Sequence, residues 1–149
     1  ATPVSSSAVR DLLAEGQPLA AGRLLGRLWS VEGEVAHGDK RGRLLGYPTA
    51  NMILDPAHGL RHGIYAVRMQ VDGAVHNGVA SFGRRPTFDN GAPLFEAFLF
   101  DFAGDLYGHH LSIGFVDYLR PEMKFDGLQA LIDQMDADCR RARGILAKA

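Results

Sequence analysis

Residues 64–82 have the sequence IYAVRMQVDGAVHNGVASF, which places two apolar, alternating segments on either side of Asp72-Gly73. Alternation with a period of two is typical of a β-strand. The Asp-Gly pair favours a two-residue hairpin, because both central positions of a type I′ turn need a positive φ. The sequence therefore predicts an antiparallel hairpin with strands over 64–71 and 75–82.

The chain on both sides of this hairpin predicts further strands and several helices. Short segments bounded by Gly, Pro, Asp or Asn predict strands near 27–36, 94–100 and 111–119. Helical patterns follow Ser5-Ser6-Ser7, cover 19–25, and run from the N-cap candidate Asp126 to about Leu146. Antiparallel strands followed by one amphipathic helix predict a mainly β fold, a small closed barrel with the helix packed outside.

Length and charge narrow the class of protein. A chain of 149 residues with 46% apolar content predicts one main domain with a core of its own. Sixteen basic and seventeen acidic side chains give a net charge of −1, so no global field attracts nucleic acid or an anionic membrane. No apolar run approaches the roughly 20 residues that span a bilayer, and the first residues lack the form of a signal peptide. A soluble cytoplasmic protein is expected.

Cysteine and histidine give no metal site. The single cysteine, Cys139, excludes an internal disulfide and a cysteine-based zinc site. It continues an apolar helical series formed by Leu128, Leu131, Ile132 and Met135, which predicts a buried structural thiol. The six histidines show no spacing typical of metal ligation on a helix.

The segment Gly33–Asn51 contains four glycines, three basic residues and a Thr-Ala-Asn end. Glycines let backbone N–H groups approach a ligand, basic side chains neutralise phosphate, and a hydroxyl beside a carboxamide supplies oxygen ligands for Mg²⁺. This combination predicts a nucleotide site. It is not a P-loop or a dinucleotide-binding motif, because neither glycine pattern is present.

Glu96 is the one charged residue in the otherwise apolar predicted strand 94–100. Alternation places Leu94, Glu96, Phe98 and Phe100 on one face, and the other face is apolar as well. Burial favours the protonated form of an isolated carboxylate, which is one way that proteins make a general base. The alternative is a strand at an edge or mouth, with Glu96 in water or paired with Arg84 or Arg85.

Five motifs occur in an order that resembles riboflavin kinases over roughly residues 22–147. They are the Gly33–Asn51 segment, Gly63-Ile64-Tyr65, Gly78-Val79 with Gly83-Arg84-Arg85-Pro86-Thr87-Phe88, Glu96 with Asp105-Leu106-Tyr107-Gly108, and Leu119-Arg120-Pro121-Glu122 with Phe125. The N-terminal residues resemble the domain junction of bacterial bifunctional FAD synthetases. The resemblance implies that 1–21 is a helical linker from a missing adenylyltransferase domain, and that 22–149 is the riboflavin kinase domain.

The same resemblance implies a six-stranded antiparallel Greek-key barrel that transfers the γ-phosphoryl of ATP to the terminal ribityl hydroxyl of riboflavin, giving FMN and ADP. It implies that Gly38 and Arg43 cover the ATP phosphates and that Thr49 and Asn51 hold Mg²⁺ and ATP. Glu96 is then the catalytic base, and the implied flavin-binding residues are Arg120, Glu122 and Phe125. The chain departs from its relatives at Arg43, where some have lysine, and at Ser81, where asparagine is frequent.

Two other functions remain open from the sequence. A non-catalytic flavin-binding barrel would bind riboflavin without making ADP, and it leaves the Thr49 and Asn51 pair unexplained. A nucleic-acid-binding barrel needs a basic groove with exposed aromatic residues. Here the bases are matched by acids and the phenylalanines occupy core-like positions, so neither nucleic acid nor membrane is an expected partner.

Overall fold

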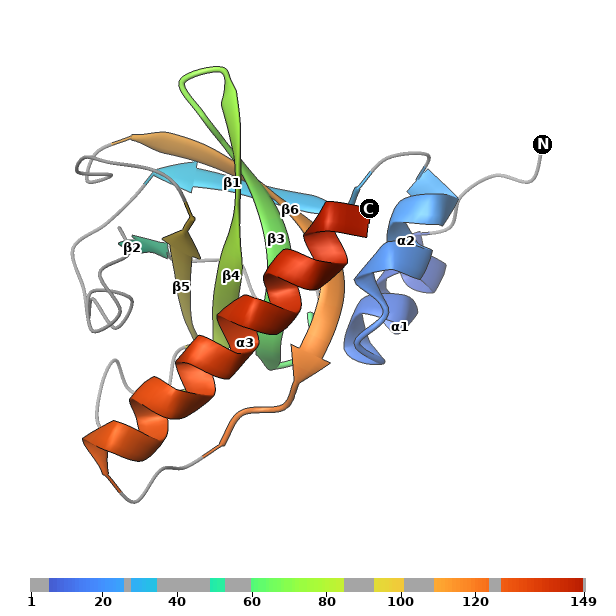
Figure 1. Ribbon diagram of the computed structural model, residues 1–149. Coiled ribbons are helices and arrows are strands. Elements are labelled where there is room, and N and C mark those ends of the chain that lie inside the picture. The colour runs from blue at the N-terminus through green and yellow to red at the C-terminus, as the bar shows by residue number, and fades with distance from the viewer. Residues whose placement is uncertain are drawn as a thin grey trace.

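In the part of the chain that the structure describes, one antiparallel sheet of six strands, in the order β1-β6-β3-β4-β5-β2, forms the centre of the molecule (Figure 1). The computed structural model describes residues 6–25, 28–34, 49–52, 60–84, 93–100, 109–123 and 127–148. The strands are β1 (Ser30–Glu34), β2 (Thr49–Met52), β3 (Gly63–Val71), β4 (Ala74–Arg84), β5 (Pro93–Leu99) and β6 (His110–Arg120). The helices are α1 (Ser6–Ala14), α2 (Pro18–Leu25) and α3 (Leu128–Lys148).

The β3–β4 hairpin forms at the predicted place. Val71 and Ala74 are the last paired residues, and Asp72 and Gly73 make the turn between them. Their φ values are 50° and 85°, so both central positions are positive, as a type I′ turn requires. The prediction of an antiparallel hairpin is confirmed.

Among the described residues, the larger of two hydrophobic clusters lies on the concave side of the curled sheet. Phe115 on β6 is fully buried there, and its ring lies 5.1 Å from that of Tyr65, 5.2 Å from that of Trp29 and 5.8 Å from that of Phe95. The first two helices join this core through three buried residues, Val9, Leu13 and Ala21. The N-terminal helices therefore pack on the same core as the strands, and the expected domain boundary between residues 21 and 22 falls within α2.

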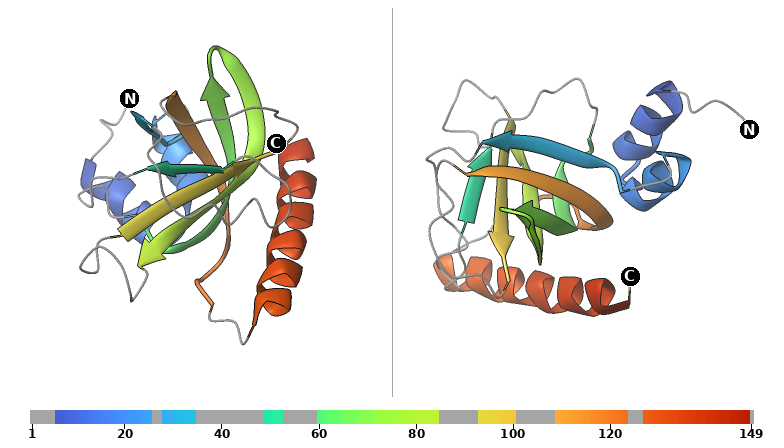
Figure 2. Two further views of the ribbon diagram at one scale, coloured as in Figure 1. Left: turned by 90° about the vertical axis from the view of Figure 1, so that its left-hand side faces the viewer. Right: turned by 90° about the horizontal axis from the view of Figure 1, so that it is seen from above.

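The second core lies between the sheet and α3, which crosses its outer face (Figures 1 and 2). Buried apolar residues of the helix pack against β3, β4, β5 and β6; on the helix they are Met135, Cys139, Ala142 and Leu146. The C-terminal part of α3 is also tied to β3, because Arg68 Nη2 donates to the carbonyl oxygen of Leu146 at 3.1 Å. This helix covers the sheet face on which the candidate site lies.

The mainly β class with a long C-terminal helix is confirmed, and β2 is the strand that alternation alone does not reveal. In the described residues, β1 and β2 each pair with one neighbour and lie at opposite ends of the strand order. Among the described strands the sheet is therefore open between β1 and β2, where the sequence predicts a closed barrel. Among the described residues, no helix has both the length and the apolar character needed to cross a membrane.

Candidate active site

Glu96 is buried on β5 with 2% of its surface exposed. The predicted alternation is confirmed. Phe95, Ala97 and Leu99 belong to the larger core on the concave side of the sheet, and Phe98 belongs to the core between the sheet and α3. The alternative in which Glu96 faces water is wrong. Its Oε2 atom is buried and accepts no hydrogen bond in the part of the chain that the structure describes. The side chains of Arg84 and Arg85 lie outside the described residues, so the alternative ion pair stays a prediction.

The short strand β2 brings the Thr-Ala-Asn segment next to Glu96. In the antiparallel β2–β5 pair, Thr49 lies opposite Phe98 and Asn51 lies opposite Glu96. The structure describes β2 by its backbone, and this register fixes where the two predicted metal ligands lie on the sheet. A candidate Mg²⁺-binding strand and a candidate proton acceptor are therefore direct neighbours.

The register places five residues in one row across the sheet. Asn51 on β2 pairs with Glu96 on β5, Glu96 with Ser81 on β4, Ser81 with Ile64 on β3, and Ile64 with Arg120 on β6. Residues directly opposite each other in antiparallel strands lie on the same face of a sheet. Glu96 and Arg120 therefore lie on the same face, the one that α3 covers.

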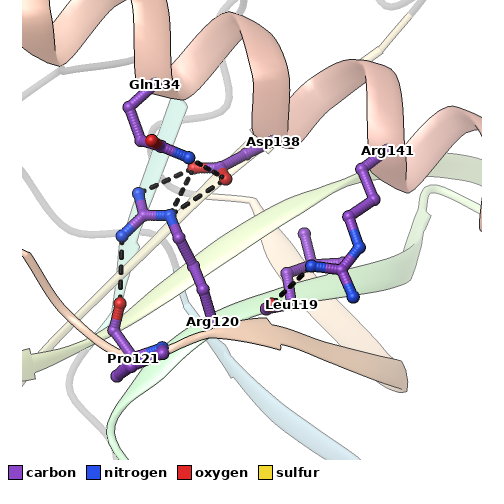
Figure 3. A network of polar contacts seen from close by, with 6 residues as sticks. All are labelled: Leu119, Arg120, Pro121, Gln134, Asp138 and Arg141. Carbon is purple, nitrogen blue, oxygen red and sulfur yellow. Dashed lines mark hydrogen bonds and ion pairs between the residues drawn. The ribbon is translucent and has the colours of Figure 1, made fainter.

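Arg120 lies at the far end of this row from Glu96. Three strand spacings of about 4.8 Å separate them, which is roughly 14 Å along the sheet. The guanidinium of Arg120 is directed to α3, where Nε lies 2.9 Å from Asp138 Oδ1 and Nη2 lies 2.7 Å from Asp138 Oδ2 (Figure 3). The structure thus brings Asn51 to Glu96 but brings Arg120 to Asp138, and a flavin contact by Arg120 stays a prediction.

Glu122 lies in an exposed segment that leaves the end of β6. Its carboxylate occupies the space in front of Gly83 on β4, so that a Cβ added to Gly83 would collide with it. Gly83 pairs with Leu94, two residues along the β4–β5 ladder from the Ser81–Glu96 pair. The absence of a side chain at position 83 therefore lets a predicted flavin-binding residue lie against the sheet near the row of Glu96.

Three of the predicted site residues, Gly38, Arg43 and Phe125, lie outside the described residues. Their predicted contacts with ATP and flavin stay predictions. The described part of the chain holds no group of three or more His, Cys, Asp or Glu residues that could bind a metal ion. Mg²⁺ prefers oxygen ligands and is usually held by few protein groups together with substrate phosphates. Thr49 and Asn51 are residue types that supply oxygen ligands, and this chemistry fits a Mg²⁺ that enters with a nucleotide.

Asp138 is the polar residue of this region that the sequence reasoning missed. A signal was present, because Asp138 follows Met135 by three residues and precedes Ala142 by four, and so interrupts the apolar stripe of α3. The neighbouring Cys139 is buried as predicted. Burial is the main cause that raises the pKa of Cys139 to about 12, and the negative charge of Asp138 adds to it. This thiol is therefore protonated at neutral pH.

Residues 25–146 match the protein family described as "Flavokinase: Riboflavin kinase". A Pseudomonas fluorescens protein is 43% identical over 145 residues, and a Listeria monocytogenes protein is 39% identical over 147 residues. Both are described as "Bifunctional riboflavin kinase/FMN adenylyltransferase". Each alignment covers 97% of this chain and 47% of the relative, so the chain spans about half the length of these curated relatives.

Two solved structures share the fold. A Streptococcus pneumoniae protein described as a macrolide-efflux protein superposes with a TM-score of 0.80 at 37% identity, over 91% of this chain and 45% of that chain. A riboflavin kinase from Trypanosoma brucei superposes with a TM-score of 0.56 at 27% identity, over 80% of both chains. The fold described above is therefore present in a protein described as a riboflavin kinase.

Proposed function

We propose that this chain, which belongs to the riboflavin kinase family, transfers the γ-phosphoryl group of ATP to the terminal ribityl hydroxyl of riboflavin. The products are FMN and ADP. The observation that carries this proposal is the register of β2 and β5, which sets Asn51 opposite the buried carboxylate of Glu96. Phosphoryl transfer depends mainly on positioning and charge neutralisation, and one proton acceptor beside the nucleotide is sufficient.

Glu96 accepts the proton of the ribityl hydroxyl in this proposal. The hydroxyl oxygen forms a bond to the γ-phosphorus, the bond from that phosphorus to the β,γ-bridging oxygen breaks, and ADP leaves. A carboxylate with 2% exposure on an otherwise apolar strand is shielded from water, so it accepts this proton from the substrate rather than from solvent.

Thr49 and Asn51 hold the nucleotide's Mg²⁺ through their side-chain oxygens, and Gly38 and Arg43 contact the ATP phosphates. The bound ion neutralises charge on the β- and γ-phosphates. The support for this assignment is the placement of β2, since both predicted ligands lie on the strand adjacent to Glu96. Two residues apart on one strand, Thr49 and Asn51 lie on the same face of the sheet.

Riboflavin lies toward the 120–125 segment, where Arg120, Glu122 and Phe125 contact the flavin. Two observations support this placement. The carboxylate of Glu122 lies against Gly83 near the row of Glu96, and Arg120 belongs to that row. In a longer chain the partner is an adenylyltransferase domain that precedes residue 22 and uses the FMN made here. A cytoplasmic location is part of the same proposal.

The direct experiment incubates the chain with riboflavin, ATP and Mg²⁺ and separates FMN from riboflavin by chromatography. The proposal predicts FMN and ADP in equal amounts. Riboflavin binding, measured by quenching of flavin fluorescence, with no FMN and no ADP formed would instead establish a non-catalytic flavin-binding barrel.

A further inference from the structure

Two side-chain contacts join the end of β6 to α3, and each of the two elements donates one of them (Figure 3). Arg120 on β6 donates to Asp138 on α3, and Arg141 on α3 donates from Nη1 to the carbonyl oxygen of Leu119 at 2.7 Å. Asp138 also accepts a hydrogen bond from Gln134 Nε2 at 3.0 Å. The helix thus fixes the place at which residues 121–123 leave the sheet.

Burial distinguishes the Arg120–Asp138 pair from another ion pair on the same helix. The side chains of Arg120 and Asp138 are 14% and 7% exposed, whereas those of Arg140 and Asp136 are 74% and 50% exposed. An exposed pair contributes little to stability, but removing one partner of a buried pair leaves the other charge uncompensated. A neutral residue at position 138 would therefore release Arg120, and the same change at 136 would leave it in place.

Arg120 also forms a hydrogen bond within the segment that follows it. Its Nη1 donates to the carbonyl oxygen of Pro121 at 3.0 Å, so the guanidinium that contacts Asp138 also holds the next peptide group. Two residues further on, the carboxylate of Glu122 lies against Gly83 of β4. The 120–123 segment is therefore hydrogen-bonded to α3 through Arg120 and lies close to β4 at Glu122.

We propose that Asp138 is a positioning residue for riboflavin, which acts through Arg120 by holding the 120–123 segment in its place against α3. This rests on the proposed function, in which Arg120 and Glu122 contact the flavin. Asp138 makes its contacts at the β6 end of the sheet row, three strands from Glu96 and four from the β2 strand of Thr49 and Asn51. Its loss is therefore expected to weaken riboflavin binding and to leave nucleotide binding nearly unchanged.

The test is Asp138→Asn, which keeps the size of the side chain and removes its charge. Riboflavin affinity is measured by fluorescence quenching, and KM is measured separately for riboflavin and for ATP. A released segment is expected to raise the riboflavin Kd and KM about tenfold, since small misplacements of positioning groups have large effects. The KM for ATP should change by less than about twofold. The matched control, Asp136→Asn, removes the exposed charge of the same helix and should change none of these values.

An equal change in both KM values, or no change in the riboflavin Kd, would overturn the proposal. If Asp138→Asn does not fold, Gln134→Ala tests the proposal instead. It removes one neutral hydrogen bond to Asp138 and should raise the riboflavin Kd about threefold. An unchanged riboflavin Kd in this variant also overturns the proposal. The Kd requires no turnover. A chain that binds riboflavin but makes no FMN would contradict the proposed reaction, and its riboflavin Kd values would still test the role of Asp138.

Discussion

Asn51 is the backbone partner of Glu96 in the antiparallel β2–β5 pair. The two residues come from distant parts of the sequence, and one ladder of backbone hydrogen bonds sets their separation. Sites built on strands are held more precisely than sites on loops. The strand pair therefore gives the proposed Mg²⁺ ligand and the proposed proton acceptor a fixed relative position before any substrate binds.

Asn51→Ala is expected to weaken the use of Mg·ATP more than the binding of riboflavin. Hydrogen bonds and ligand contacts to charged groups contribute about 1.5–3 kcal/mol, so the KM for Mg·ATP should rise about tenfold or more. Steady-state kinetics at varied Mg·ATP, together with riboflavin titrations, measure the two effects separately. Asn77→Ala is the control, because Asn77 is an exposed residue of β4 outside the proposed site. Equal losses of both affinities would mean that the site had collapsed.

The same substitution at two glycines should change stability in opposite directions. Gly73 has a φ of 85° and Gly144 lies in α3, and an added Cβ would meet no atom within 4 Å at either position. Gly73→Ala places a side chain in the left-handed region and should lower the free energy of unfolding by about 1 kcal/mol or more. Gly144→Ala should raise it by about 1 kcal/mol through helix propensity. Urea denaturation measures both, and a stabilising Gly73→Ala would contradict the type I′ turn.

The buried thiol of Cys139 should make stability fall at alkaline pH. Its pKa is raised from 9.0 to about 12 in the folded chain, so above pH 9 the unfolded chain loses this proton while the folded chain keeps it. The contribution to the free energy of unfolding is complete below pH 9 and falls by about 1.4 kcal/mol per pH unit as the pH rises toward 12. The comparison is with Cys139→Ala, by urea denaturation at pH 8 and pH 10. A stability difference between the two proteins that stays constant over this range would refute the prediction.

Local patterns were sufficient to predict most of the fold. The β3–β4 hairpin follows from alternation around Asp72-Gly73, and α3 from an apolar helical series that contains Cys139. Alternation also showed that both faces of β5 are apolar, which left burial of Glu96 as one of two possibilities, and the structure shows that Glu96 is buried. In each case the residues that determine the structure are close in the sequence.

Contacts between distant segments could not be predicted in this way. The strand β2 has only four residues, so its polar–apolar alternation is of the shortest length that indicates a strand. Its pairing with β5 becomes visible only in the structure. The pairing of Arg120 is a second such contact. The family resemblance implies a place for Arg120 near the flavin, and nothing in the sequence indicates that its guanidinium pairs with Asp138 on α3. The charge of a residue is visible in a sequence, but its partner depends on tertiary packing.

The most direct measurement is the turnover of Glu96→Gln, which keeps the size of the side chain and removes its basicity. The rate of FMN formation should fall roughly 10²-fold or more, the usual contribution of a general base, while the riboflavin Kd stays near that of the unmodified chain. Glu32→Gln is the control, because Glu32 is an exposed carboxylate of β1. FMN formation by Glu96→Gln at the rate of Glu32→Gln would contradict the central claim that Glu96 accepts the proton.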